Sequence, residues 1–240
     1  MNNKLYIVGT PIGNLEDITF RALRILKEVK YIACEDTRVT QKLLNYFGIE
    51  NKKLMTYNNF TEKNSAKGLL SILNSGESVA LVSDAGMPVV SDPGFEIIRL
   101  AKENGIFIEI VPGVNAAITA FVGSSFDNTF TFLGFIKDKS QQRINQLTNL
   151  ELGTYIFYVS PHKIESTLND IYQVFQTNAQ VCLAREVTKV HESWYFGNAL
   201  EVLNQLKEKN EIKGEFTMVL HLPKIKRTKV SKYPSKNSIN

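Results

Sequence analysis

The sequence predicts an α/β fold built from two α/β domains, each with a parallel or mixed sheet flanked by helices. Short apolar runs of strand length alternate along the 240 residues with segments of helical spacing. This alternation is typical of such sheets. A polar stretch at 124–128 interrupts it. We therefore expect one domain over 1–123, a second over 124–223, and a basic, disordered tail over 224–240.

The first half contains five apolar runs, which predict strands at 5–8, 31–34, 54–57, 79–82 and 106–111. The intervening segments repeat apolar residues at helical spacing and predict helices at 18–29, up to 47, at 66–73, at 95–103 and from 112 onward. Asp17 or Thr19 is expected to cap the first helix. Gly48 and Gly105 are expected to end the second and fourth helices.

The second half continues the same rhythm after the polar stretch. Its apolar runs predict strands at 131–135, 155–159, 181–185, 194–196 and 216–222. Helical spacing predicts helices at 140–150, 163–175 and 199–207. No internal repeat or low-complexity tract is visible.

Composition excludes several classes of protein. No apolar run approaches the roughly 20 residues that span a bilayer, and the chain runs from Met1 straight into a strand without a signal peptide. Cys34 and Cys182 stand alone inside apolar strands, so we expect buried free thiols and no metal site. These features predict a cytoplasmic protein that does not enter a membrane.

The net charge of +4 depends on the end of the sequence. Residues 224–240 contain six Lys and Arg residues and no acid, and without those six the chain has 22 basic against 24 acidic residues. A basic tail suits a polyanionic partner such as RNA. The alternative is a solvated segment without a role.

Six segments rich in glycine, proline, small or charged residues each follow a predicted strand, at 9–14, 35–38, 83–94, 112–117, 159–162 and 185–189. Parallel strands carry their carboxyl ends to one edge of a sheet, where α/β proteins bind ligands. We therefore expect these loops from both halves to meet at a cleft. The 83–94 loop, with Asp84, is the expected centre of that cleft.

The chemistry of these loops excludes some ligands. The 9–13 turn has neither the GxGxxG pattern nor the lysine of a Walker A loop, so a polyphosphate lacks its usual cradle. His162, His191 and His221 are not spaced as metal ligands. The sequence therefore predicts a ligand that is held by backbone groups, small residues and one carboxylate, without a metal.

Four of these segments carry a resemblance to a known family. The motifs at 5–15, 34–38, 82–88 and 184–189 resemble the 16S ribosomal RNA (cytidine-2′-O)-methyltransferases of the tetrapyrrole methylase superfamily, and the likeness extends over residues 4–222. It implies S-adenosylmethionine in a cleft between two α/β domains, and a homodimer. It also implies 2′-O-methylation of a cytidine in the decoding region of the small ribosomal subunit.

The resemblance also implies a set of cofactor-binding residues, namely Pro11, Ile12, Asp84, Met87, Asn115, Ala116 and Val159. Asp84 is suited to bind the ammonium of the methionine moiety or a ribose hydroxyl, and Met87 to pack on an apolar face. The structural alternatives are that Asp84 caps the following turn and that Met87 fills the core.

Charged residues at the strand ends are the candidates for catalysis and RNA binding. The candidate bases, which would help to deprotonate the 2′-hydroxyl, are Glu35, Asp36 and Glu186. The candidate RNA contacts are Arg38, His162, Lys163, Arg185 and Lys189. Ion pairs that only order their own loops are the alternative for most of them, and a helix start is the alternative for His162 and Lys163.

Two other functions remain open at the level of the sequence. One is methylation of a tetrapyrrole carbon or of a protein side chain by a relative in the same superfamily. The other is an RNA-binding module without catalysis, which would not need the 83–94 loop. The charged motifs at 35–38 and 185–189 and the basic tail favour RNA methylation over the first alternative.

Overall fold

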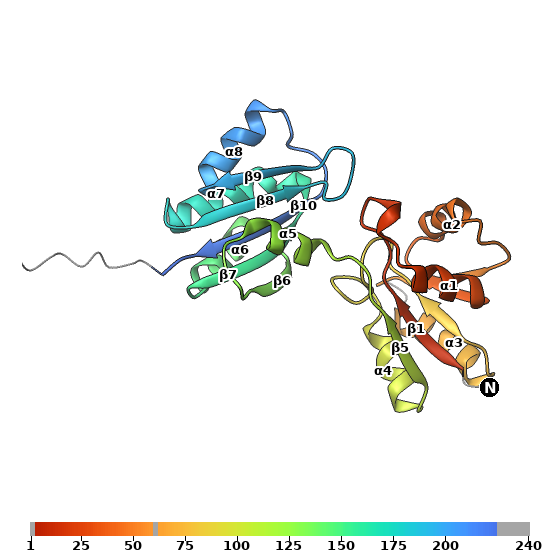
Figure 1. Cartoon of the computed structure of the whole chain (residues 1–240). Helices are drawn as coiled ribbons and strands as arrows, with labels where there is room; N and C mark the ends of the chain where they lie inside the picture. The colour runs from red at the N-terminus through yellow and green to blue at the C-terminus, as the bar shows by residue number, and fades with distance from the viewer. Residues whose placement is uncertain (1–2, 60–61, 225–240) are drawn as a thin grey trace, which may run out of the picture.

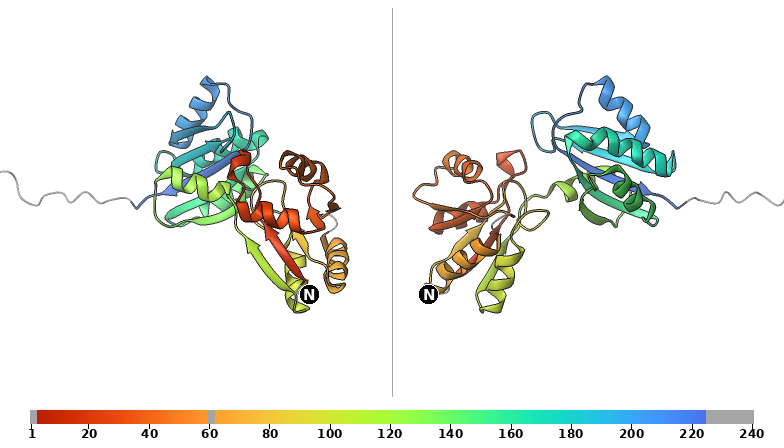
Figure 2. Two further views of the ribbon diagram at one scale, coloured as in Figure 1. Left: turned by 45° about the vertical axis from the view of Figure 1, so that its right-hand side comes forward. Right: turned by 180° about the vertical axis from the view of Figure 1, so that it is seen from behind.

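The computed structural model describes residues 3–59 and 62–224, so the predicted tail over 224–240 lies outside the described residues except for Lys224. The described residues form two five-stranded sheets, one in each half of the chain, with helices against both (Figure 1). The right-hand view of Figure 2 shows the two halves side by side, with a stretch of chain leading from one to the other. The predicted α/β fold with parallel and mixed sheets is confirmed.

The first sheet is entirely parallel. Its strands are β1 (Lys4–Val8), β2 (Tyr31–Cys34), β3 (Lys53–Thr56), β4 (Val79–Leu81) and β5 (Phe107–Val111), in the order β3-β2-β4-β1-β5. Strand residues alternate between its faces. Val8 packs with α1 (Phe20–Glu28) and α2 (Thr37–Tyr46), whereas Leu5 and Ile7 pack with α3 (Glu62–Asn74) and α4 (Phe95–Glu103).

The second sheet is mixed. Its strands are β6 (Thr131–Phe135), β7 (Gly153–Val159), β8 (Gln180–Arg185), β9 (Ser193–Gly197) and β10 (Phe216–Leu222), in the order β6-β7-β10-β8-β9. Strand β10 is antiparallel to both of its neighbours, and β6 is parallel to β7. Strands β7 and β8 therefore end at the same edge of the sheet, and β10 begins at that edge.

Helices cover both faces of the second sheet. On one face, α6 (Ser140–Thr148), α7 (Ile164–Phe175) and α8 (Ala199–Glu208) contribute to a core that includes Leu147, Leu168 and Val202. On the other face, α5 (Ala116–Ser124) packs Ala117 and Ala120 against Ile156, Cys182 and Val219. The described residues contain no helix with the length and apolar character needed to cross a membrane.

The domain boundary predicted at 124 falls at the end of α5. Because α5 contacts β7, β8 and β10 of the second sheet, we propose that the boundary lies before this helix, near 112–115. The polar 124–128 stretch then belongs inside the second domain, where Ser125 takes a left-handed conformation with φ 54°.

Local signals set most element ends as predicted. The Thr19 side chain accepts a hydrogen bond from Ala22 N and caps α1, and Gly48 follows α2 with φ 62°. The first helix runs from Phe20 to Glu28, slightly shorter than the predicted 18–29, because Thr19 and Val29 are its extended caps; a separate 3-10 turn, Leu15–Asp17 (η1), precedes it. The helix predicted at 66–73 begins earlier, at Glu62. Cys34 and Cys182 are buried free thiols, as predicted.

Candidate functional site

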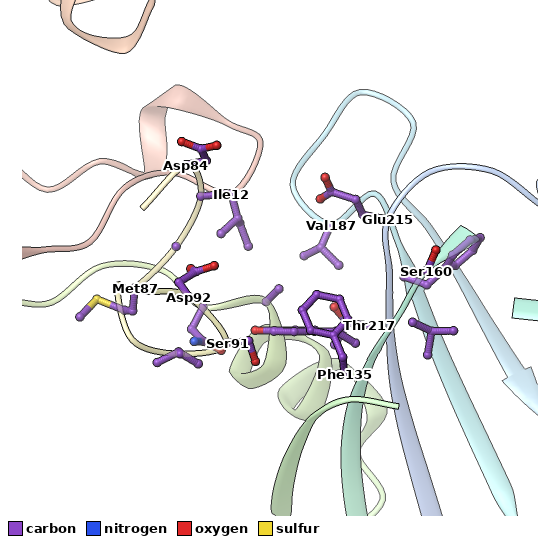
Figure 3. A pocket seen from close by; sticks show the side chains of 18 of the residues that line it. Ile12, Asp84, Met87, Ser91, Asp92, Phe135, Ser160, Val187, Glu215 and Thr217 are labelled. Carbon is purple, nitrogen blue, oxygen red and sulfur yellow. The ribbon is translucent and has the colours of Figure 1, made fainter. Parts of the chain in front are cut away.

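A pocket of about 420 Å³ lies between the two sheets, within the size range of small-molecule sites. It is lined by the loops that follow β1, β4, β5, β7 and β8, by the end of β6 and by the start of β10. Figure 3 shows Ile12, Asp84 and Asp92 on one side of it and Val187 and Glu215 on the other. Five of the six loops predicted to meet contribute residues to this pocket, and the 35–38 segment lines a separate cavity.

Three loops of the first half are locked together at the pocket wall. Thr10 and Gly86 exchange backbone hydrogen bonds of 2.9 and 3.1 Å. Gly9 and Gly113 cross so closely that a Cβ added to Gly9 would lie 2.7 Å from Gly113 Cα. Gly113 N also donates to the sulfur of Met87 at 3.3 Å. The wall is therefore built by backbone contacts that side chains would prevent.

The 83–94 loop presents Asp92 to the pocket through an unusual backbone. Val89 and Ser91 have φ values of 76° and 67°, a region that is strained for residues with a Cβ and especially for a β-branched one. The far end of the loop is held by Glu62, whose Oε1 accepts hydrogen bonds from Gly94 N at 3.0 Å and Glu96 N at 3.1 Å. These contacts fix a conformation that the chain would otherwise avoid.

The electrostatics of the pocket are acidic. Its lining residues include Asp84, Asp92 and Glu215, and no Lys, Arg or His is among them. Burial raises the pKa of Asp84, and burial together with the charge of Glu35 raises the pKa of Asp92 to about 6. A pocket of this kind favours a ligand with positive charge and hydrogen-bond donors, and disfavours a polyphosphate.

The opposite part of the pocket is apolar and aromatic. Ile12 and Val187 belong to one buried cluster that joins the two halves. Phe135 and Tyr158 form an edge-on ring pair with centroids 5.5 Å apart, and 61% of the Phe135 surface is exposed. An exposed aromatic ring at a pocket is suited to contact a planar ring of a ligand.

Six of the seven predicted cofactor residues line this pocket, namely Ile12, Asp84, Met87, Asn115, Ala116 and Val159. Pro11 instead lines a neighbouring cavity of about 390 Å³, which also reaches Asp84. The sulfur of Met87 points away from the pocket toward Gly113 (Figure 3). The Asn115 side chain caps α5 by accepting hydrogen bonds from Ala117 N and Ile118 N.

The three predicted bases do not line the pocket. Glu35 and Asp36 line a separate cavity that they share with Asp84, and Asp36 N donates to Asp84 Oδ1 at 3.0 Å. The hydrogen bonds from Arg38 lower the pKa of Asp36 to about 2. Burial opposes ionisation of Glu186, but the hydrogen bonds from Glu215 N and Lys189 Nζ lower its pKa overall.

The predicted RNA contacts fall into two groups: residues at the surface near the strand ends, and residues held by ion pairs within the second half. Arg38 and His162 are exposed at the strand ends, and Lys163 is half-buried in the 3-10 turn Pro161–Lys163 (η2) beside the pocket. Lys189 is half-buried and pairs with Glu186 and Glu215 at 3.1 and 3.0 Å.

Arg185 departs from the prediction of an RNA contact, since its side chain is only 5% exposed. Its guanidinium donates to the carbonyls of Lys213 and His191 at 2.7 and 2.9 Å and pairs with Glu211. These partners assign it a role in holding the segments around β8 together.

Several lining residues were given no role from the sequence, namely Phe135, Tyr158, Glu215 and Asp92, although the loop that contains Asp92 was the expected centre of the cleft. Asp92 precedes Pro93 and Gly94 in the 83–94 loop, and this sequence is the feature that could have marked it as a residue held in a fixed turn. Glu215 precedes β10, and it reaches the pocket because an antiparallel strand begins where its neighbours end. Within residues 3–59 and 62–224, no group of three His, Cys, Asp or Glu side chains is placed to hold a metal ion.

Comparison with known proteins gives consistent matches. The family model for Tetrapyrrole (Corrin/Porphyrin) Methylases matches residues 4–203. The chain is 52% identical over 220 residues to a protein named ribosomal RNA small subunit methyltransferase I from Mycoplasmopsis pulmonis (strain UAB CTIP), covering 91% of this chain and 98% of the relative. It is 48% identical over 219 residues to the protein of that name from Hydrogenobaculum sp. (strain Y04AAS1), covering 90% and 95%.

A solved structure shares the fold. The uroporphyrin-III C-methyltransferase from Thermus thermophilus, complexed with S-adenyl homocysteine, aligns with a TM-score of 0.62 at 16% identity. The alignment covers 91% of this chain and 97% of that chain.

Proposed function

The chain belongs to the tetrapyrrole (corrin/porphyrin) methylase family, and we propose that it methylates the 2′-oxygen of a cytidine ribose in the decoding region of 16S ribosomal RNA. Its curated relatives at 52% and 48% identity are ribosomal RNA small subunit methyltransferases. The chain is a methyltransferase of that group. The cytidine, the 2′-oxygen and the decoding region go beyond these relatives' names, and they are what the family resemblance carried by the four sequence motifs implies.

The observation that supports methyl transfer most directly is the charge of the pocket. S-adenosylmethionine supplies, when bound, a methyl group on a positively charged sulfur, and its methionine part carries an ammonium. Three carboxylates line the pocket with no cation among the lining side chains, which fits such a ligand. The solved structure of the same fold is complexed with the demethylated form of this donor.

Specific residues of the chain would hold the donor. The carboxylate of Asp84 is suited to the ammonium of the donor, and the backbone around Asn115 and Val159 to its polar edges. Phe135 and Tyr158 offer ring faces and edges for a planar base. Holding both reactants in one orientation supplies much of the rate enhancement in a displacement that has a good leaving group.

The RNA would approach over the exposed cations at the strand ends. Arg38 and His162 are exposed on opposite halves of the chain, and Lys163 lies beside the pocket-lining Ser160 and Pro161. Contacts from such side chains to phosphates position an RNA without reading its sequence. We further propose that the chain acts in the cytoplasm as a homodimer, which light scattering of the purified protein would test.

The two alternative functions fit less well. Methylation of a tetrapyrrole or a protein would place the chain among relatives of low identity, whereas identity to the ribosomal RNA methyltransferases is 52%. An RNA-binding module without catalysis would not require a strained loop that turns an acid toward a pocket.

The proposal is tested by transfer of labelled methyl groups. Purified protein is incubated with labelled S-adenosylmethionine and assembled small subunits, free 16S RNA or a tetrapyrrole. We expect label in the RNA of the small subunit and loss of that label when the target ribose lacks its 2′-hydroxyl. Label on another atom of the RNA or on the tetrapyrrole would contradict the proposal.

Donor binding is tested separately through Asp84. We expect Asp84→Ala to abolish binding of S-adenosylhomocysteine in calorimetry, because it removes a carboxylate shared by the pocket and its two neighbouring cavities. Glu28→Ala is the control, since Glu28 is an exposed residue of α1 that pairs with Arg24 of the same helix. Unchanged affinity of Asp84→Ala would remove Asp84 from the donor site.

A further inference from the structure

We propose that Asp92 is the residue that accepts the proton of the attacking ribose hydroxyl. The proposal rests on the proposed 2′-O-methylation and names the base for that reaction. None of the three acids indicated by the sequence lines the pocket, whereas Asp92 does. Its carboxylate faces the interior of the pocket from the 83–94 loop (Figure 3).

The structure holds Asp92 in this position from both sides. Before it, Val89 and Ser91 adopt left-handed backbone conformations. After it, Glu62 binds the N–H groups of Gly94 and Glu96. The hydroxyl of the fully buried Tyr57 accepts from Ile97 N at 3.1 Å and donates to Glu62 at 3.2 Å. A loop secured in this way can keep a carboxylate oriented while a substrate arrives.

The surroundings of Asp92 suit a base that works near neutral pH. The titratable and hydrogen-bonding groups close enough to influence the ionisation of Asp92 are Glu35 just after β2, Asp84 and Ser83 after β4, and Tyr158 on β7. Burial and the charge of Glu35 raise its pKa to about 6, although the hydrogen bond with Ser83 opposes the shift. At pH 7 the carboxylate is therefore mostly ionised, yet it is more basic than an ordinary aspartate.

The other acids near the pocket are less suitable. Asp84 already accepts a hydrogen bond from Asp36 N. Glu215 is paired with Lys189, and 78% of its side chain is exposed to solvent. The pKa of Asp36 is about 2, so it would be a weak base. Asp84 and Asp92 both line the pocket and both have a raised pKa, but the Asp36 N–H engages the carboxylate of Asp84 and opposes its shift, whereas the pKa of Asp92 rises to about 6.

The proposed step balances as follows. The 2′-oxygen forms a bond to the methyl carbon while its O–H bond breaks and the proton moves to a carboxylate oxygen of Asp92. The bond between the methyl carbon and sulfur breaks, and its electron pair remains on sulfur, which becomes a neutral thioether. The protonated Asp92 then returns its proton to water, so no oxidant, reductant or metal is needed.

The test compares Asp92→Asn with the unmodified protein on small subunits and labelled donor. We expect kcat to fall by about 10²- to 10⁴-fold, the range associated with a positioned base, while the Kd for S-adenosylhomocysteine changes by a few-fold at most. Asp127→Asn is the matched control, because Asp127 is exposed outside the pocket. Asp92→Glu should recover part of the lost rate, because it restores a carboxylate.

Two readouts distinguish proton transfer from a structural role. The kcat of the unmodified protein should rise with pH up to about 6 and level off above, and this rise should be absent in Asp92→Asn. Carbon-detected NMR of the carboxyl groups should show one Asp signal that titrates near pH 6 in the unmodified protein and is missing from the variant. This second readout does not depend on activity.

The outcomes that overturn the proposal are specific. A rate of Asp92→Asn within a few-fold of the unmodified protein would exclude Asp92 as the base. A large rise in Kd at unchanged kcat would make Asp92 a donor contact instead. Failure of the proposed function itself is visible separately, since the unmodified protein would then place no label on a ribose 2′-oxygen.

Discussion

The pocket wall depends on the missing side chains of Gly9 and Gly113. An added Cβ at Gly9 would lie 2.6 Å from Met87 Sδ and 2.7 Å from Gly113 Cα and N. Backbone atoms cannot move away from such a contact as a flexible side chain can. The absence of a Cβ at these two residues therefore determines how closely the loops after β1 and β5 approach.

We expect Gly9→Ala to lower the free energy of unfolding by about 1–3 kcal/mol, the usual cost of overpacking, and to weaken donor binding. Urea denaturation and calorimetry measure the two effects. Gly68→Ala is the matched control: Gly68 is exposed in α3 with no atom within 4 Å of an added Cβ. It should stabilise by about 0.5–1 kcal/mol. Equal stability of both variants would contradict this account of the crossing.

At the scale of elements, the ends of β2 and β8 each carry an arginine, but the two differ in surroundings. The Arg38 side chain is 86% exposed and that of Arg185 is 5% exposed. In the sequence they look alike because each lies in a charged motif at or just after the end of a strand, Arg185 as the last residue of β8 and Arg38 four residues beyond β2. The partner of Arg38 is Asp36, two residues away, whereas those of Arg185 lie at 191, 211 and 213.

We expect Arg38→Ala to weaken binding of 16S RNA and to reduce the slope of log K against log salt by about 1, because one phosphate contact is lost. Arg185→Ala should instead lower the free energy of unfolding by about 1–3 kcal/mol, since it leaves part-buried partners without their hydrogen bonds. Filter binding at several KCl concentrations and urea denaturation measure the two effects. If Arg185→Ala folds with full stability and loses the salt slope, its assigned structural role is wrong.

The order and type of the elements were accessible from the sequence because apolar residues form short runs in strands such as β1 and recur at helical spacing in helices such as α1. The chain itself does not report which sheet a short apolar helix joins, and α5, rich in alanine, packs on the second sheet. The sequence also does not show whether a strand runs parallel or antiparallel to its neighbours. The reversal of β10 brings Glu215 and Thr217 to the pocket, and local pattern carries no sign of it.

For the whole molecule, the two halves meet through loops on either side of the pocket. Asn14 N donates to Thr188 Oγ1 at 3.1 Å. A Cβ added to Gly13 would lie 2.5 Å from Lys189 Cγ and 2.8 Å from Thr188 Oγ1. These contacts, with Ile12 against Val187 in one cluster, set the width of the pocket.

We expect Gly13→Val to separate these loops and to weaken binding of S-adenosylhomocysteine by about tenfold, or roughly 1.4 kcal/mol. The stability of each half should change little, because Gly13 is exposed and lies outside both cores. Calorimetry measures the affinity and urea denaturation the stability, with Gly68→Ala as control. Unchanged affinity would show that the contact at Gly13 does not control the pocket.

The central place of β10 has a consequence for biosynthesis. Phe216–Leu222 pair with both β7 and β8, so the second sheet stays in two pieces until these late residues have been translated. The first half, whose strands are all made by residue 111, can fold while the rest is still being synthesised. A nascent chain therefore completes the pocket only after β10 has left the ribosome.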